Sequence, residues 1–386
     1  MTIPTSITAL VQTQNGYNPE PEGHIRFDSF EPYVELREVA PSDLEENHVF
    51  IEMTMASINP SDLHFLKGEY GQPRVAGKAA GFEGVGTVIA AGSDPYATSL
   101  IGQRVSFVAT PSGSGTWATH AVTEAAVCIP MPDTVSDPDA AGFIVNPLTA
   151  AAMFDQAKEA GTGAVVLTAG ASQVSKFIIA LARDAGLASI AIVRRDVHND
   201  TLKALGATEV LNQTSDDFGE RLAEAVREHK PATLIDAVVD ATSTTVFNAM
   251  GKNSTWLVYG SLSPDIPPIS DPGGMIFQNK TIRGFWLHRG CWGHRSRRRS
   301  ASSVKSRLVS ATVAGVPTSA QPFPSVTSWA GWLRRSKIRA AKSSSPRDLS
   351  IRSGRRSFRS RRFRRRSRGT SLHRPSGRLR FRSPGV

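Results

Sequence analysis

The chain is poor in cysteine and in long apolar segments. Only two cysteines, Cys128 and Cys291, occur among its 386 residues, which excludes a disulfide framework and any zinc lobe built on several cysteines. No run of 18 apolar residues is present, so the sequence offers no candidate transmembrane helix. The first 23 residues contain neither Lys nor Arg nor an apolar segment of signal-peptide length. We therefore expect a cytoplasmic protein that does not enter a membrane.

Acidic residues are almost absent from the last quarter of the chain. Residues 288–386 hold 27 Lys and Arg and a single acid, Asp348, which leaves 18 basic and 33 acidic residues for the first 287. The whole-chain net charge of +11 therefore describes neither part. Helical and strand periods also vanish after residue 287, so we expect residues 288–386 to form a disordered Arg/Ser-rich, low-complexity tail. We interpret this tail as the out-of-frame translation of a GC-rich coding region; the alternative is a genuine nucleic-acid-binding tail.

Residues 5–130 are predicted to be rich in β-structure. Short apolar runs alternate with turns containing Gly, Pro, Asn and Asp, a pattern typical of a small barrel or folded sheet. The glycine-rich run from Gly81 to Gly86 lies in this part and is interpreted as turn geometry. A helix is expected over 140–158. The strands predicted here are 34–39, 49–55, 86–90 and 104–108.

From Gly163 onward, predicted strands and helices alternate. This alternation predicts a parallel, doubly wound sheet, so the fold class is α/β with the β-rich part first. The strands are expected at 164–167, 189–193, 208–211, 233–239, 254–259 and 281–286, and the helices at 173–185, 198–205, 216–229 and 242–250.

The stretch from Gly163 to Asp196 has the form of a dinucleotide-binding unit. A buried strand leads into a small, turn-prone segment and then into an amphipathic helix. Of the glycines that such a turn normally carries, Gly170 is present, whereas Gln173 and Ser175 stand where others are expected. The N–H groups of a helix amino terminus can still receive phosphate. A purely structural strand–helix turn is the alternative.

Arg194 and Arg195 follow the second strand of this unit. An acid at this place would accept hydrogen bonds from the adenine ribose, whereas arginine matches a 2′-phosphate, so the pair favours NADPH over NADH. Asp196 could instead pair with either arginine, and a solvated surface pair is the second alternative.

Five short motifs occur along the chain in the same order as in one known family. On the basis of these motifs, residues 5–287 resemble the zinc-independent medium-chain dehydrogenases/reductases. Within that superfamily the chain is most similar to NADPH-dependent 2-enoyl thioester reductases and quinone oxidoreductases. The resemblance implies a GroES-like catalytic domain over 1–145, a Rossmann-type NADP-binding domain over 146–287 and a homodimer. The motifs are Asn59-Pro-Ser-Asp62, Gly68-Glu-Tyr-Gly71, Val145-Asn-Pro-Leu-Thr-Ala150, Tyr259-Gly260 and Arg283-Gly-Phe-Trp-Leu287.

The resemblance also implies roles for individual residues. Tyr70 matches the catalytic proton donor, and Gln173 replaces a family glycine in the phosphate turn. The residues matched to cofactor contacts are Asn146, Gly170, Ala171, Ser172, Gln173, Val174, Arg194, Arg195, Asp196, Tyr259, Gly260, Ser261, Leu262, Phe285, Trp286 and Leu287.

These residue types suit the implied chemistry. Hydride from the nicotinamide adds to the β-carbon of a conjugated carbonyl, and an acid must then stabilise the developing enolate or protonate the α-carbon. A tyrosine is protonated at neutral pH and can do either. The alternative is that Tyr70 is only an aromatic lining of the site, and His64 is a weaker candidate donor.

A catalytic zinc, as in the related alcohol dehydrogenases, is not expected. Phe82 stands before Glu83 where those enzymes place a histidine, and no cysteine lies near Asn59. Three protein ligands for an open zinc site cannot be assembled from these residues.

Two matters stay open at this point. Quinones, enoyl thioesters and small enones are all candidate substrates, and the resemblance predicts a helix and closing strands after Leu287 that this sequence does not show. A second hypothesis is therefore a catalytically impaired reductase scaffold whose basic tail binds nucleic acid.

Overall fold

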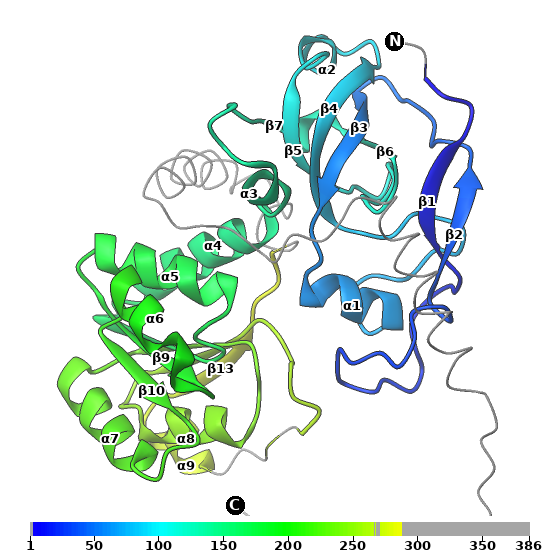
Figure 1. Ribbon diagram of the computed structural model, residues 1–386. Coiled ribbons are helices and arrows are strands. Elements are labelled where there is room, and N and C mark those ends of the chain that lie inside the picture. Colours follow the sequence, from blue (N-terminus) through cyan, green and yellow to red (C-terminus); the bar gives the residue numbers. More distant parts are fainter. Residues whose placement is uncertain (1–2, 266, 268–270, 288–386) are drawn as a thin grey trace, which may run out of the picture. The chain divides into compact units, whose positions relative to one another are not determined.

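A computed structural model describes residues 3–265, 267 and 271–287 of the chain (Figure 1). The segment predicted to be a tail, residues 288–386, lies outside the described residues, as does Cys291. No helix in the described ranges combines the length and the apolar character needed to cross a membrane.

The first part of the chain forms two antiparallel sheets. β1 (Ile7–Gln12) pairs with β2 (Val34–Val39). The second sheet has five strands in the order β6-β3-β4-β5-β7. Apolar side chains from its strands and from α2 (Pro95–Ser99) form its buried core. The bounds are β3 (His48–Ala56), β4 (Glu83–Ala91), β5 (Arg104–Val108), β6 (His120–Glu124) and β7 (Ile129–Pro130), and a 3₁₀ turn, η1 (Ala125–Val127), precedes β7.

The Asn59-Pro-Ser-Asp62 motif starts a helix, α1 (Pro60–Lys67). Pro60 fits the first helical position because its missing N–H would have no partner there. The Asn59 N–H donates to the Asp62 carboxylate at 2.7 Å, which forms one half of a capping box. Gly68 ends the helix with φ +74°, in the left-handed region that favours glycine. The Asn59-Pro-Ser-Asp62 motif thus sets the start of α1, and Gly68 sets its end and the direction of the chain toward Tyr70.

The prediction of a turn over Gly81 to Gly86 is wrong for most of that run. Only Gly81 has a positive φ, of +95°, whereas Glu83 to Gly86 open strand β4. A Cβ at Gly84 would lie 2.8 Å from the Met55 carbonyl oxygen, and one at Gly86 would lie 2.2 Å from that of Glu52. The two strand glycines therefore let β4 approach the backbone of β3 closely.

The second part contains the predicted parallel sheet, which is confirmed. Its six strands run in the order β10-β9-β8-β11-β12-β13, and every pairing is parallel. The predicted strands at 233–239, 254–259 and 281–286 end earlier than expected. The bounds are β8 (Ala164–Leu167), β9 (Ala188–Val193), β10 (Glu209–Asn212), β11 (Thr233–Asp236), β12 (Thr255–Val258) and β13 (Thr281–Gly284).

Helices cover both faces of this sheet. In β8, Val165 and Leu167 pack with α4 and α5, whereas Val166 packs with α7 and α8, as the alternation of side chains along a strand requires. The single helix expected over 140–158 is two helices, interrupted at Gly142. The bounds are α3 (Asp137–Ala141), α4 (Val145–Glu159), α5 (Gln173–Asp184), α6 (Asn199–Leu205), α7 (Phe218–His229), α8 (Ala241–Ala249) and α9 (Pro272–Phe277), with a 3₁₀ turn, η2 (Asp196–His198).

Candidate active site

The strand order reverses between β8 and β11, and ligands of such sheets bind at the carboxyl ends of the strands beside this point. Gly170 follows β8 here, and its N–H donates to the Ile192 carbonyl at 2.8 Å. A Cβ on Gly170 would lie 2.9 Å from the Ala191 Cβ. The one glycine that the turn retains therefore allows the turn to pack closely against β9.

The amino terminus of α5 has the form of an anion site. Ser172 caps the helix by accepting a hydrogen bond from the Ser175 N–H at 3.2 Å. No hydrogen bond within the described ranges uses the N–H of Ala171 or of Val174. These donors and the helix dipole suit a phosphate group, although Gln173 has replaced the family glycine.

Arg194 and Arg195 lie exposed at the carboxyl end of β9. Neither guanidinium forms a hydrogen bond or an ion pair with the described part of the chain. The Asp196 carboxylate accepts hydrogen bonds from the side chains of Asn199, at 3.2 Å, and Asn212, at 3.0 Å. Pairing of Asp196 with an arginine, which was one alternative, is therefore wrong, and both guanidinium groups are available to a 2′-phosphate.

Asp236, at the end of β11, was missed by sequence reasoning. It is fully buried and accepts hydrogen bonds from the Trp256 indole at 2.7 Å, from the Val238 N–H at 2.8 Å and from the Thr168 hydroxyl. The available signal was a charged residue, Asp236, that interrupts the apolar run from Leu234 to Val239. This carboxylate links Thr168 after β8 and the loop after β11 to Trp256 within β12, and so fixes the loops around the switch point.

The segment after β12 lies against the phosphate turn. The Tyr259 hydroxyl hydrogen-bonds with Ser172 and Ser175, and burial raises the pKa of Tyr259 to about 12. A Cβ on Gly260 would lie 2.9 Å from the Ala237 carbonyl oxygen, and the Leu262 N–H donates to that oxygen at 3.0 Å. Tyr259 is thereby brought to the turn, whereas no hydrogen bond within the described ranges joins Ser261 to it.

Tyr70 meets a residue from the far end of the described chain. The Trp286 indole Nε1 donates to the Tyr70 hydroxyl oxygen at 3.0 Å, and the two rings make an edge contact with centroids 5.9 Å apart. Phe82 packs on Tyr70 at 5.3 Å. Burial raises the pKa of the Tyr70 phenol above its ordinary value of 10.0. Tyr70 is therefore a neutral hydroxyl at pH 7.

The direction of the Trp286 hydrogen bond matters for this hydroxyl. An indole N–H is only a donor, so Tyr70 is the acceptor and its own proton is not used. No other hydrogen bond of this hydroxyl is formed within the described ranges. The phenolic proton can therefore be donated to a ligand.

Asn146, in the first turn of α4, is held by a chain of buried polar groups. Its Nδ2 donates to the Asn59 Oδ1 at 2.8 Å. The Asn59 Nδ2 donates in turn to the Glu83 carboxylate at 2.9 Å. The other Glu83 oxygen accepts from the backbone N–H of Ile144 and Val145. Glu83, which the sequence placed in a turn, thus orients Asn59 and the amino terminus of α4.

The remaining predicted residues lie as follows. Phe285 donates its N–H to the Val258 carbonyl at 2.7 Å and packs against the core around α5, and Leu287 is half-buried.

His64, the weaker candidate donor, faces Glu69 with Nδ1 3.5 Å from Oε2, and no ring contact or hydrogen bond joins it to Tyr70. Among the described residues, no group of three His, Cys, Asp or Glu side chains could hold a metal ion.

Two family models match the chain. The model of the alcohol dehydrogenase GroES-like domain matches residues 45–133, and that of the zinc-binding dehydrogenase matches residues 174–301. The first covers the β3–β7 sheet, and the second begins in α5.

Curated relatives and solved structures agree with these matches. The mitochondrial enoyl-[acyl-carrier-protein] reductase of Arabidopsis thaliana is 32% identical over 257 residues, which are 65% of this chain and 68% of that protein. The human protein of the same name is 30% identical over 261 residues, or 66% and 68% of the two chains. A structure from Mesorhizobium loti, described as a candidate NADPH:quinone reductase, is 45% identical with a TM-score of 0.75 and covers 81% of this chain and 90% of its own.

A more distant structure shows the same fold. The mitochondrial 2-enoyl thioester reductase heterodimer of Candida tropicalis is 22% identical, covers 88% of this chain and 98% of its own, and has a TM-score of 0.66. The ordered motifs, both family models and these relatives agree, and the chain belongs to the medium-chain dehydrogenase/reductase family.

Proposed function

We propose that the protein is an NADPH-dependent, zinc-independent reductase of an activated double bond, in an enoyl thioester or enone, or of a quinone. The observation that carries this proposal is the Tyr70 hydroxyl. It accepts from Trp286, stays neutral at pH 7 and keeps a proton to donate. The names of the relatives, enoyl reductases and an NADPH:quinone reductase, support the same two substrate classes.

The described residues fit NADPH as the cofactor. The free N–H groups at the amino terminus of α5 suit its pyrophosphate, and the unpaired guanidinium groups of Arg194 and Arg195 suit its 2′-phosphate. A related enoyl thioester reductase has been solved as a complex with NADP and crotonyl-CoA. When bound, NADPH supplies the hydride for the reduction.

The protein's own contribution lies in binding and in proton donation. The Tyr70 hydroxyl hydrogen-bonds the substrate carbonyl oxygen, where negative charge develops, or gives its proton to the α-carbon. Trp286 orients this hydroxyl, and Asn59 and Glu83 hold Asn146, which would contact the nicotinamide.

Replacement of Tyr70 tests this role. Tyr70→Phe removes the hydroxyl and keeps the ring that packs on Phe82. We expect kcat for NADPH oxidation with crotonyl-CoA to fall about 10²-fold or more, the usual contribution of a general acid. Tyr96→Phe is the matched control because Tyr96 is 48% exposed. If kcat is unchanged in Tyr70→Phe, Tyr70 is not the proton donor.

We also propose a homodimer that forms through the β13 edge of the parallel sheet. β13 has its single partner strand in β12 among the described strands, and Ile276 and Phe277 in the adjacent α9 are 71% and 85% exposed. A second copy of the chain would cover both features. Light scattering should give twice the chain mass, and a monomer at micromolar concentration would rule the dimer out.

Two further assignments remain proposals. A boundary between a catalytic domain, 1–145, and an NADP-binding domain, 146–287, is supported by the start of α4 at Val145. A cytoplasmic location is supported by the low cysteine content of the chain, and fractionation of the source cells tests it. No observation on the described residues favours nucleic-acid binding.

A further inference from the structure

Glu69, the residue before Tyr70, has a buried carboxylate with an unusual set of partners. Its side chain is 4% exposed. Oε1 accepts a hydrogen bond from the Glu22 N–H at 2.7 Å, and Oε2 accepts one from the Gly23 N–H at 3.2 Å. The His64 Nδ1 lies 3.5 Å from Oε2. A carboxylate is stabilised by such backbone donors, which here come from a segment 46 residues earlier in the chain.

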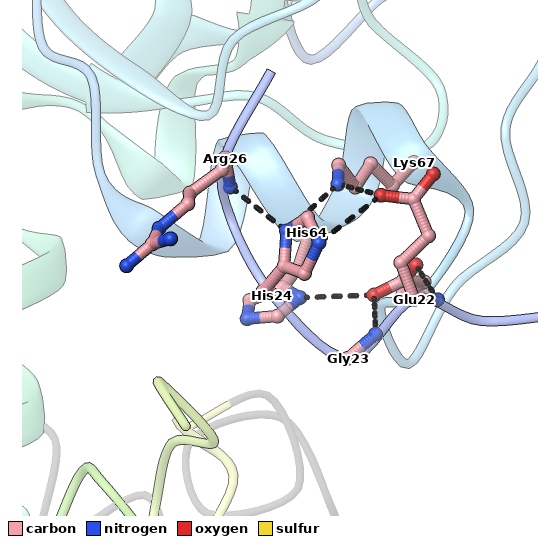
Figure 2. A network of polar contacts seen from close by, with 7 residues as sticks. Glu22, Gly23, His24, Arg26, His64 and Lys67 are labelled. Atoms are coloured by element: carbon pink, nitrogen blue, oxygen red, sulfur yellow. Dashed lines mark hydrogen bonds and ion pairs between the residues drawn. The ribbon is translucent and has the colours of Figure 1, made fainter. Parts of the chain in front are cut away.

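The segment that supplies these donors is itself fixed to α1. Figure 2 shows Lys67 and His64 of α1 facing the chain from Glu22 to Arg26. The Lys67 ammonium, on a side chain 2% exposed, pairs with the Glu22 carboxylate, lies 3.3 Å from the His24 Nδ1 and stands 5.0 Å over the Phe27 ring. The Asn18 N–H donates to the Gly68 carbonyl at 2.9 Å. Residues 18–27 are thus attached to α1 and to the turn after it.

The turn between α1 and Tyr70 depends on these side-chain contacts. Gly68 is in the left-handed conformation, and the Glu69 N–H donates to the His64 carbonyl five residues earlier, a capping bond that ends the helix. The space above Gly68 is filled by the Arg74 guanidinium, which would lie 2.6 Å from a Cβ at that position. The Glu69 carboxylate joins the turn to the backbone of Glu22 and Gly23. Arg74 and Glu69 thus both attach the turn before Tyr70 to neighbouring segments, in addition to its backbone hydrogen bonds.

We propose that Glu69 is a positioning residue for Tyr70, and that its carboxylate, held by the backbone N–H groups of Glu22 and Gly23, keeps the Tyr70 hydroxyl where it accepts from Trp286 and donates to the substrate. This role rests on the proposed function, because Tyr70 has to be the proton donor. Loss of the carboxylate frees the turn and moves the hydroxyl, and displacements of about 1 Å at a reacting group cost as much as 10²-fold in rate.

The test compares Glu69→Ala, Glu69→Gln and Tyr70→Phe, singly and combined, in the full-length protein with NADPH and crotonyl-CoA. Glu69→Ala should lower kcat about 10-fold to 100-fold and leave the KM for NADPH within about twofold. Glu69→Gln keeps one acceptor oxygen for the Glu22 N–H, so its loss should be smaller. Glu20→Gln is the matched control, since Glu20 is an exposed acid of the same segment with no side-chain contact.

The double variant separates positioning from a general structural role. If Glu69 acts through Tyr70, Glu69→Ala should lower kcat no further in the Tyr70→Phe background. Additive losses would overturn the inference and leave the proposed function intact. A normal kcat in Tyr70→Phe alone would overturn both. If Glu69→Ala lowers the Tm by more than about 5 °C, Glu69→Gln replaces it in the comparison, alone and combined with Tyr70→Phe.

Discussion

At the scale of single residues, the site is built around buried polar groups. Asp62 is the clearest case because it is 1% exposed and accepts hydrogen bonds from the backbone N–H of Asn59, at 2.7 Å, and of Phe82, at 2.9 Å. Burial raises the pKa of this carboxyl from 3.8 to about 8, and the neighbouring Glu83 acts in the same direction. Asp62 is therefore protonated at neutral pH in the folded protein.

This shift predicts a pH dependence of stability. Between pH 4 and pH 8 the folded state binds one proton more than the unfolded state, so the stability that Asp62 contributes is lost as the pH rises through this window. The loss amounts to at most about 1.4 kcal/mol per pH unit and ends above pH 8. Asp62→Asn cannot titrate, so the Tm of the variant relative to wild type should rise from pH 5 to pH 8. Asp133→Asn, at an exposed site, should show no such trend, and a constant difference for Asp62→Asn would contradict the assignment.

At the scale of elements, close approach of strands β3 and β4 sets the geometry behind Glu83. A Cβ at Gly86 would lie 2.2 Å from the Glu52 carbonyl oxygen, a contact that can be relieved only by moving backbone. Gly86→Ala should therefore destabilise the protein by about 3 kcal/mol. At Gly163 a Cβ meets nothing within 4 Å, so Gly163→Ala should change stability by less than about 0.5 kcal/mol. Thermal unfolding, monitored by circular dichroism, measures the Tm of both variants. If Gly86→Ala and Gly163→Ala have equal Tm values, β3 and β4 do not approach closely enough at Gly86 to exclude a Cβ.

Elements with a strong periodic signal could be predicted from the sequence. The alternation after Gly163 specifies the parallel sheet, and the end of the apolar run at Val193 places Arg194 and Arg195 at the carboxyl edge of this sheet, where we propose that the cofactor binds. The roles of Glu83, Asp236 and Glu69 could not be predicted, because their partners lie in segments far along the chain and come together only on folding. The glycines of β4 were misjudged because close strand approach and turn geometry both call for glycine.

At the scale of the whole molecule, the two ends of the described chain complete one site. Tyr70 comes from the turn after α1, and its hydrogen-bond donor, Trp286, follows the last described strand. The residues proposed to contact the cofactor lie between them in sequence, mostly at the parallel sheet. Residues 5–287 thus bring the proposed proton donor together with the residue proposed to orient it.

The most direct test measures NADPH and NADH oxidation with crotonyl-CoA, a quinone and a small enone, for wild type and for the Arg194→Ala/Arg195→Ala variant. Wild type should oxidise NADPH with at least one acceptor. Each guanidinium–phosphate contact contributes about 1.5–3 kcal/mol, so the variant should raise the KM for NADPH more than 10-fold and change that for NADH little. No NADPH oxidation with any acceptor, or equal effects on both cofactors, would contradict an NADPH-dependent reductase.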